Sequence, residues 1–425
     1  MKSLHIPLIL IILILLNIGM PLSRTEPLET PDSIITYDPV IATIISQVNE
    51  TLLRTHLETL VNYSPRYTGT YGCIKSAEYI YHEFEQLGLS TRYQEWSAVG
   101  NRYHPHFFQS ENVEATLPAT QSRTEIIFGA HYDTVRNTPG ADDNGASVAA
   151  TLVAATLLSQ YEWKHTLRFV SFSGEENGLL GSHAYAKEAY NQERDILAYL
   201  NADMIAHAQT PETAQRFRAY GTADIAWILT IIEEVNQIYD INFNLTIGII
   251  DEGRRGGSDH HSFVEYGFNT IAFFEYEWNP RMHQPEDTIE HINFQYLENT
   301  TRLIIGTMAH LATMDISYPR MRINNPKKGH FYYAGFQRAS LRKLQTIVIN
   351  DIWIYPFIVE GQYPITNVEY YYNDVLVYNT TQAPFTWHLN RRSFGKQTIT
   401  VKAYDAGGNM ISDKTTLWFF NLPSF

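Results

Sequence analysis

The sequence predicts an α/β fold in which helices sandwich a mostly parallel central sheet, followed by a C-terminal immunoglobulin-like β-sandwich. Two observations lead to this fold class. Between residues 35 and 320, buried strand-like runs alternate with helical patterns, and beyond residue 340 only short strand-like runs remain. Strands that alternate with helices are typical of parallel sheets, whereas regular short strands without helices are typical of sandwiches.

The expected elements of the α/β part follow from the spacing of its apolar residues. Helical spacing predicts helices at 41–60, 74–87, 148–158, 223–239 and 294–314. Bounded apolar runs predict buried strands at 125–130, 166–172, 196–200 and 270–274. Strand, polar loop and helix form the repeating unit, and in such sheets binding sites lie outside the carboxyl ends of the strands.

A loop that contains Pro319, Asn325-Pro326 and two lysines interrupts this pattern, and we expect the domain boundary between residues 325 and 340. The α/β domain is therefore assigned to residues 35–320 and the accessory β-sandwich to residues 340–425. The predicted strands of the sandwich are 345–350, 368–372, 375–378, 385–389 and 397–404. Turn residues such as Asn373-Asp374 separate them.

Composition excludes several classes of protein. The chain has 425 residues, more than one hydrophobic core usually spans, so two domains are expected. A net charge of −14 without a long basic run argues against a nucleic-acid partner, because phosphate binding rests on clustered Lys and Arg. Cys73 is the single cysteine, so any metal has to be bound by His, Asp and Glu.

Residues 4–20 form an almost uninterrupted apolar run. The run has the length of the apolar part of a secretory signal and is slightly shorter than the roughly 20 residues that a membrane-spanning helix needs. We therefore expect an extracytoplasmic chain. Residues 20–24 lack a small-x-small cleavage pattern, so a removed signal over residues 1–24 and a retained membrane anchor are both open.

Acidic and histidine residues follow the ends of the predicted strands. His131 ends one strand, and Asp133 is placed to bond the other ring nitrogen of that histidine. Taken alone, a His-x-Asp sequence is more typical of a satisfied core histidine. Asp142-Asp143 lie at a turn before a helix. Asp143 is expected to bridge two metal ions, which leaves Asp142 or Asn144 to cap that helix.

Glu175-Glu176 follow a buried strand, where two carboxylates repel each other unless cations lie beside them. Glu176 is the candidate ligand and Glu175 the candidate general base, and a solvated surface pair is the alternative. Asp203 ends a further strand, and His283 lies in a loop with Asp287, a supporting residue outside the ligand set. Together these residues predict a two-metal hydrolase in which each ion takes one histidine, one terminal carboxylate and a share of the bridging aspartate.

Six segments also carry a family resemblance: 131–135, 139–145, 172–182, 201–204, 258–260 and 283–288. In their order and setting they resemble the co-catalytic zinc aminopeptidases, which share a fold with glutamate carboxypeptidase and the transferrin receptor ectodomain. The resemblance covers residues 40 to 315 and implies a zinc exopeptidase fold with two zinc ions. One ion would be held by His131, Asp143 and Asp203, and the other by Asp143, Glu176 and His283, with Glu175 as the base. The same ligands accept cobalt or manganese.

Two positions depart from the family pattern. Some members have a tyrosine beside the last histidine that stabilises the oxyanion, whereas here that neighbour is Met282. Either Tyr276 takes the role or the role is unfilled. Arg254-Arg255 stand where relatives hold an arginine that touches substrate, and the pair is either a recognition group or part of a solvent-exposed loop. His260-His261 are expected to support or pack rather than to bind metal.

The leading hypothesis is a secreted or membrane-tethered metallo-exopeptidase that removes N-terminal residues from peptides. Glutaminyl cyclases are similar across the sheet but use one zinc, so the metal stoichiometry separates the two. A carboxypeptidase on the same fold is a further alternative, and so is a non-catalytic receptor-like module, in which the zinc ligands are lost. The sequence sets neither the side chain preferred at the cleaved position nor the oligomeric state.

Overall fold

The computed structural model describes residues 33–250, 257–341 and 345–421. The predicted signal or anchor segment, residues 1–24, and the pair Arg254-Arg255 lie outside the described residues. Within the described ranges, no helix combines the length and the apolar character that crossing a bilayer requires.

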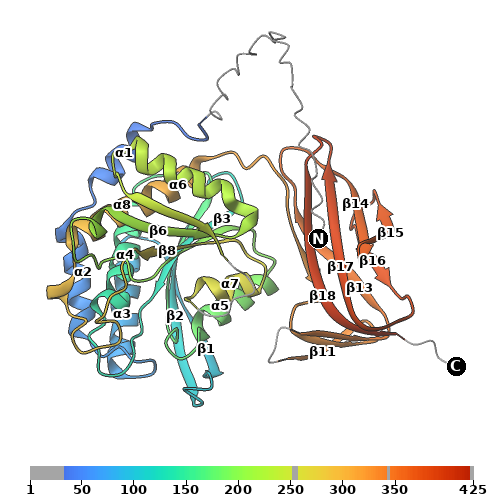
Figure 1. The fold of residues 1–425 in the computed structure, drawn as a ribbon, viewed down its shortest axis with the longest axis horizontal. Coiled ribbons are helices and arrows are strands. Elements are labelled where there is room, and N and C mark those ends of the chain that lie inside the picture. Colours follow the sequence, from blue (N-terminus) through green and yellow to red (C-terminus); the bar gives the residue numbers. More distant parts are fainter. Residues whose placement is uncertain (1–32, 251–256, 342–344, 422–425) are drawn as a thin grey trace, which may run out of the picture. The chain divides into compact units, whose positions relative to one another are not determined.

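An eight-stranded sheet forms the centre of the α/β part, in the order β1-β2-β4-β3-β5-β8-β6-β7 (Figure 1). The strands are β1 Ser90–Val99, β2 Phe107–Leu117, β3 Glu125–His131, β4 Thr166–Phe172, β5 Ile196–Ala202, β6 Arg216–Gly221, β7 Asn244–Ile249 and β8 Thr270–Glu275. The neighbours β4, β3, β5 and β8 run parallel, whereas β1–β2, β2–β4 and β6–β8 are antiparallel pairs. The central strands therefore end at one edge of the sheet, where parallel sheets carry their sites.

Helices cover both faces of this sheet (Figure 1). They are α1 Pro39–Ser46, α2 Glu50–Asn62, α3 Tyr71–Gln86, α4 Ala146–Leu158, α5 Leu180–Asn191, α6 Ala226–Ile238, α7 His260–Glu265 and α8 Phe294–Thr313. Residues of α1 to α4, α6 and α8 share one core with Ile126 and Phe128 of β3, and residues of α5 and α7 share another with Ile127. Because successive strand residues point to opposite faces, these cores lie on opposite sides of the sheet. The predicted α/β class is confirmed.

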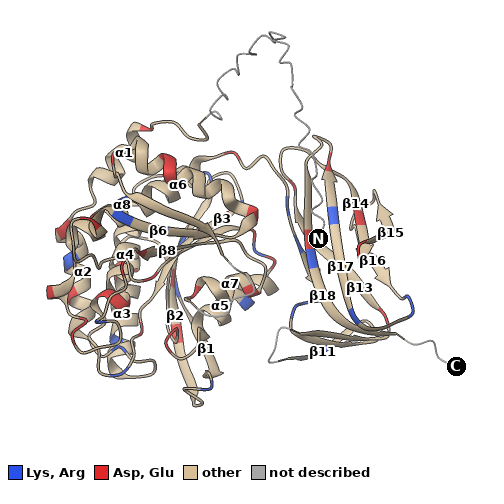
Figure 2. Ribbon diagram, viewed as in Figure 1, with Lys and Arg blue, Asp and Glu red and all other residues tan. Residues whose placement is uncertain are grey.

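The helix predicted over 41–60 is two helices. Asn49 starts a new helix after Ser46, because its side chain accepts a hydrogen bond from the backbone N–H of Leu52 at 3.1 Å. The helix α5 was not expected from the sequence, since its apolar residues are interrupted by Lys187 and Glu188. Acidic residues are spread over the helices of this part, α2 and α3 among them (Figure 2), in keeping with the acidic composition.

The C-terminal part consists of two β-sheets. A seven-stranded sheet has the order β11-β10-β12-β18-β17-β14-β15, and a three-stranded sheet has the order β16-β13-β9. The strands are β9 Arg320–Asn325, β10 His330–Tyr333, β11 Phe336–Ser340, β12 Thr346–Ile349, β13 Ile352–Val359, β14 Ile365–Tyr372, β15 Val375–Thr380, β16 Trp387–Leu389, β17 Ser393–Asp405 and β18 Met410–Asn421. Buried residues of both sheets, such as Ile323, Ile354 and Val401, share one core, which is the arrangement of a β-sandwich.

This β-rich part begins earlier than the sequence suggested. The segment 319–340, predicted as a loop, contains β9, β10 and β11. The charges of Arg320 and Arg322 and the turn residues around Pro326 conceal the strand pattern. In the structure Ile323 and Tyr332 are buried in the core of the sandwich, and this packing outweighs the local turn signals.

Candidate metal centre

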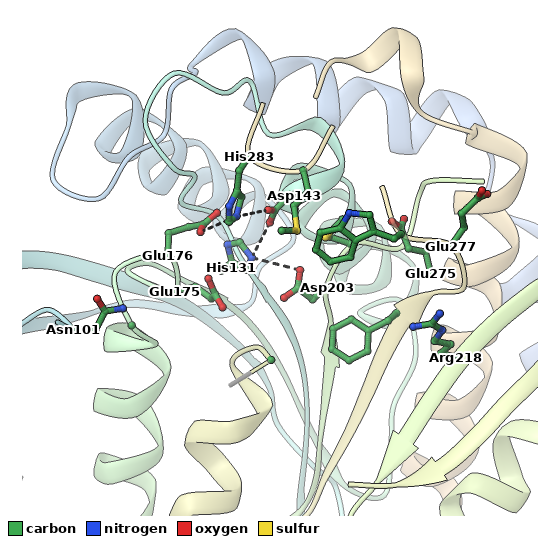
Figure 3. A pocket seen from close by; sticks show the side chains of 16 residues that line it. Asn101, His131, Asp143, Glu175, Glu176, Asp203, Arg218, Glu275, Glu277 and His283 are labelled. Atoms are coloured by element: carbon green, nitrogen blue, oxygen red, sulfur yellow. Dashed lines mark ion pairs between the residues drawn. The ribbon is translucent and has the colours of Figure 1, made fainter. Parts of the chain in front are cut away.

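Six polar side chains that are far apart in the sequence meet at the carboxyl edge of the central strands (Figure 3). His131 ends β3, Glu175 and Glu176 follow β4, and Asp203 follows β5. Asp143 comes from the loop before α4, and His283 comes from the loop after β8. Parallel neighbouring strands end side by side, so each loop brings its residue to the same place.

Asp143 lies between the two histidines. Its Oδ1 is 3.4 Å from Nε2 of His131, and its Oδ2 is 3.0 Å from Nε2 of His283. Each histidine also faces one terminal carboxylate: His131 Nε2 is 3.6 Å from Asp203 Oδ1, and His283 Nε2 is 3.1 Å from Glu176 Oε2. The carboxylate of Asp143 thus offers one oxygen to each half of the cluster.

The donor set fits metal ions rather than a purely structural cluster. Ligand atoms of His131, Glu175 and Asp203 lie within 4.8 Å of one another, and so do those of Asp143, Glu176 and His283. Oε1 of Glu176 is buried and has no hydrogen-bond partner among the described residues. Imidazole nitrogens and carboxylate oxygens without a thiolate suit zinc, and also cobalt or manganese. Cations are therefore the natural partners of this otherwise repulsive group of carboxylates.

The electrostatics of the cluster show the same need for positive charge. Burial raises the pKa of Glu175 well above its usual range, and burial together with the charge of Asp143 raises that of Glu176 to about 7. Hydrogen bonds to Asp143 and Glu176 raise the pKa of His283 to about 10. Burial alone would lower the pKa of His131, but Glu175, Asp143 and Asp203 raise it well above its usual value. Without metal, protons on the imidazoles balance the carboxylates.

Asp133 has a different role from the one predicted. Nδ1 of His131 is 3.1 Å from the backbone carbonyl of Asp133 and 3.7 Å from its carboxylate, so the carbonyl orients the ring. The carboxylate instead accepts hydrogen bonds from the backbone N–H groups of Glu175 at 3.2 Å and Glu176 at 3.4 Å, and from the hydroxyl of Thr68 at 3.0 Å. Asp133 is therefore a positioning residue for the loop that carries both glutamates.

Asp287 and Arg66 hold the segment that carries Asp143. The carboxylate of Asp287 accepts hydrogen bonds from the backbone N–H of Asp142 at 2.9 Å and of Asp143 at 3.1 Å. Arg66 is fully buried and donates to the carbonyls of Tyr132, Pro139 and Gly140 at 2.7–2.8 Å. Burial lowers its pKa to about 10, so it keeps its charge at neutral pH beside the aspartates. No motif points to Arg66, because these three carbonyls lie 66 or more residues away in the sequence.

Neither Asp142 nor Asn144 caps α4, contrary to the prediction. The helix begins without a side-chain cap. Asn144 instead donates to the carbonyl of Ala202 at 3.0 Å and accepts from the N–H of Met204 at 3.2 Å. Asp142 accepts from the N–H of Ala206 at 3.1 Å. Both side chains hold the segment that carries Asp203, and this long-range bonding replaces the cap.

Tyr276, His260 and His261 do not belong to the cluster of metal-ligand candidates. Tyr276 does not line the cavity, because its ring packs under the guanidinium of Arg216, 3.6 Å from the ring centroid. The structure therefore gives no support for an oxyanion role of Tyr276. His260 and His261 are buried, and His260 packs on Phe274 with 6.0 Å between the ring centroids. Both histidines lie outside the ligand groups.

Asp259 is a further residue near the centre that was noted only as part of a motif. Its side chain is fully buried, and its carboxylate has no hydrogen-bond partner among the described residues. Burial raises its pKa to about 7, and its charge adds to the forces that raise the pKa of Glu175. The segment Ser258-Asp259-His260 was the signal that could have indicated it.

A cavity of about 460 Å³ opens beside the ligand candidates (Figure 3). All six residues of the two ligand groups line it. Its apolar walls are formed by Met204, Phe274, Trp278 and Met282. Figure 3 shows Asn101 on the side of Glu175, and Arg218, Glu275 and Glu277 on the side of Asp203. The cavity is therefore a cleft with room for a peptide end next to the ligands.

Comparisons with known proteins agree with this geometry. The model of peptidase family M28 matches residues 112–308. Leucine aminopeptidase 1 of Leptosphaeria maculans is 26% identical over 308 residues, covering 68% of this chain and 77% of the relative. An aminopeptidase from Aneurinibacillus sp. strain AM-1 has a similar structure, with a TM-score of 0.56, 17% identity and coverage of 64% of this chain and 96% of that one.

A glutaminyl cyclase from Fimbriiglobus ruber also shares the fold, with a TM-score of 0.53, 18% identity and coverage of 62% and 95% of the two chains. At such identities a structural likeness establishes the fold alone, and the family match and the fungal relatives carry the assignment further. Together the match of residues 112–308 to peptidase family M28, the fungal relatives and the shared fold support a metallo-aminopeptidase similar to the co-catalytic zinc aminopeptidases.

Proposed function

We propose that this zinc metallo-aminopeptidase uses two ions, bridged by Asp143, to remove N-terminal residues from peptides. The observation that carries the proposal is the division of the Asp143 carboxylate, with one oxygen directed to His131 and the other to His283. The relatives named leucine aminopeptidase favour the same chemistry. His131, Asp143 and Asp203 would hold one ion, and Asp143, Glu176 and His283 would hold the other.

The zinc ions, when bound, supply Lewis-acid polarisation of the scissile carbonyl and make the attacking water more acidic. Glu175 is the group of this chain that moves protons. Burial raises its pKa well above that of an ordinary glutamate, so the carboxylate readily accepts a proton from the attacking water. Bound ions would lower that pKa, so Glu175 would start as a carboxylate, take the proton of the attacking water and pass it to the leaving amine. Asp133 keeps the Glu175 backbone in place during this exchange.

The charge of the cavity favours an amino terminus over a carboxy terminus. Outside the proposed ligand set, Glu175, Glu275 and Glu277 line it, and Arg218 is the one arginine or lysine among its described lining residues. A protonated α-amino group is attracted to this acidic surface, whereas a substrate carboxylate is repelled by it. Peptides blocked at the N-terminus should therefore be inert, and peptides blocked at the C-terminus should be cleaved. Cleavage of the N-blocked peptides would favour a carboxypeptidase.

The direct test of the proposed mechanism is the Glu175→Ala variant. We expect it to keep its zinc and to lose at least about 10³-fold in kcat on leucyl anilides, because it lacks the proton carrier. Glu58→Ala, at an exposed position of α2, is the matched control and should turn over normally. Near-normal turnover by a zinc-loaded Glu175→Ala enzyme would refute the assignment. Metal analysis should give two zinc ions per chain, and a stoichiometry of one would favour the cyclase reading.

We further propose that the chain acts outside the cytoplasm, directed there by its apolar residues 4–20. Fractionation of the expressed full-length chain, with N-terminal sequencing, tests this location. A mature terminus close to residue 24 would indicate a removed signal, and an intact terminus in the membrane fraction would indicate an anchor. Full-length protein in the cytoplasmic fraction would contradict the proposal.

A further inference from the structure

Arg218 is a cation in a cleft whose other charged groups are acidic or metal-binding. It lies on β6, directly opposite Phe274 of β8 in the antiparallel register, and both residues line the cavity. Side chains of directly opposed residues stand on the same face of a sheet. The guanidinium of Arg218 is therefore placed next to an aromatic wall of the substrate cleft.

Most of the hydrogen-bonding capacity of Arg218 is uncommitted within the described residues. Its Nη2 donates to the backbone carbonyl of Tyr276, and its guanidinium lies 5.0 Å from the ring centroid of that residue. No carboxylate of the described residues approaches its nitrogens within 4.0 Å. A guanidinium carries five N–H groups, so several donors remain for a molecule in the cleft.

The two glutamates at this end of the cavity are engaged elsewhere. Glu277 accepts a hydrogen bond from the backbone N–H of Gln209 at 3.2 Å, and Glu275 accepts one from that of His207 at 2.7 Å. Burial raises the pKa of Glu275 well above its usual range. The side chain of Glu277 lines the same cavity. This end of the cleft thus offers the hydrogen-bond donors of Arg218 beside two acidic side chains.

The position of Arg218 matches the reach of a substrate side chain. Asp203 follows β5, Phe274 lies on the neighbouring β8, and Arg218 lies on β6 beyond it. Two strand spacings of about 4.8 Å place the backbone of Arg218 about 10 Å from that of Asp203. An N-terminal residue whose amino group lies at the ligand cluster would run its side chain past Phe274, and its tip would meet the guanidinium of Arg218. Figure 3 shows Arg218 on the side of the cavity where Asp203 lies.

We propose that Arg218 makes the cleft selective for an N-terminal side chain with an uncharged hydrogen-bond acceptor at its tip, such as tyrosine or glutamine, over a hydrocarbon of similar size. The inference rests on the proposed aminopeptidase function and adds the substrate class. Apolar walls bind the body of the side chain in either case, so discrimination comes from the tip alone. A hydrocarbon tip leaves the donors of Arg218 desolvated and unpaired, which disfavours its binding. An anionic tip is disfavoured by Glu277.

The test compares aminoacyl coumarin amides in two matched pairs, Tyr against Phe and Gln against Met, on the full-length zinc enzyme. We expect kcat/KM to favour Tyr and Gln by about ten-fold or more. In Arg218→Met the ratios should fall to about one, because Tyr and Gln lose their hydrogen-bond donor and Phe and Met no longer leave that donor unpaired. Arg216→Met is the control, because Arg216 lies on the same strand, stacks on Tyr276 and does not line the cavity.

Ratios near one in the wild-type enzyme would overturn the proposal without recourse to any variant, which covers the case of a misfolded Arg218→Met. An unchanged ratio in a folded Arg218→Met would overturn it as well. A higher kcat/KM on the Glu amide than on the Gln amide would refute the statement that the preferred side chain is uncharged. Failure of the proposed function is a separate result, in which the zinc-loaded wild type turns over none of these four substrates and no leucyl anilide.

Discussion

Replacement of Asp287 by asparagine tests how the bridging aspartate is held. At pH 7.5 the carboxylate is ionised, because burial raises its pKa to about 6 and no further. Its two oxygens accept from the N–H groups of Asp142 and Asp143 at 2.9 and 3.1 Å. Asparagine keeps the shape but turns one acceptor into an NH₂ group that faces an N–H donor. One charge-assisted hydrogen bond is lost in a buried site, which costs about 1.5–3 kcal/mol of unfolding free energy.

The same substitution should weaken zinc binding by about 10- to 100-fold, because the backbone of the shared ligand loses its fixed position. Urea titration of the metal-free chain measures the first effect, and competition with a chromophoric chelator measures the second. Excess zinc should restore kcat. Glu286→Gln, an exposed neighbour in the same loop, is the control and should change neither quantity. An Asp287→Asn variant with wild-type zinc affinity would show that the two backbone contacts do not position Asp143.

Three further predictions concern the charge and the packing. Arg66→Met should lower the free energy of unfolding, measured by urea titration, by about 3–5 kcal/mol. The variant leaves buried aspartates without their cation and three carbonyls without a donor. A loss below about 1 kcal/mol would contradict this account. The raised pKa of His283, about 10 in the metal-free chain, stabilises the fold fully below its unfolded value of 6.5 and ceases to do so as pH rises through about 10. Zinc must displace that proton, so the apparent zinc affinity should rise about ten-fold per pH unit from pH 7 to 9 in chelator competition, and a flat profile would argue against His283 as a ligand. Leu417 lies in the core of the sandwich, and Leu417→Ala should lower the free energy of unfolding by about 2–5 kcal/mol. The kcat of the folded enzyme should stay unchanged. A parallel loss of kcat would link the sandwich to catalysis.

The sequence was sufficient for the layout of the α/β part because its signals are local and strong. The alanine-rich run that forms α4 and the apolar runs that form β3 and β4 have clear boundaries. Once the strands are taken as parallel, their ends share an edge, and the residues after them come together. The fold class and the group of ligand candidates follow from that rule.

Contacts between distant residues were beyond the reach of the sequence. The spacing of Asp133 would allow its carboxylate to bond His131, but in the structure the backbone carbonyl of Asp133 contacts the ring nitrogen. The carboxylate instead accepts a hydrogen bond from the backbone N–H of Glu175. Asp142 and Asn144 look like helix caps, but hydrogen bonds to a segment about 60 residues away replace the cap. Local pattern predicts what a side chain can bond, and tertiary structure decides which partner is near.

The fastening of the Asp203 segment to the side chains beside Asp143 bears on which ions the enzyme can use. Asn144 forms hydrogen bonds to the backbone on both sides of Asp203, at Ala202 and Met204, and Asp142 accepts one from the backbone N–H of Ala206. The position of Asp203 relative to Asp143 is therefore fixed by these hydrogen bonds and does not adjust to the size of a bound ion. Cobalt and manganese are close to zinc in size and in ligand preference. Adding either ion after a chelator has removed the zinc should therefore restore turnover. Calcium binds six to eight oxygen ligands, and this rigid site supplies too few of them. Calcium should therefore not restore peptidase activity.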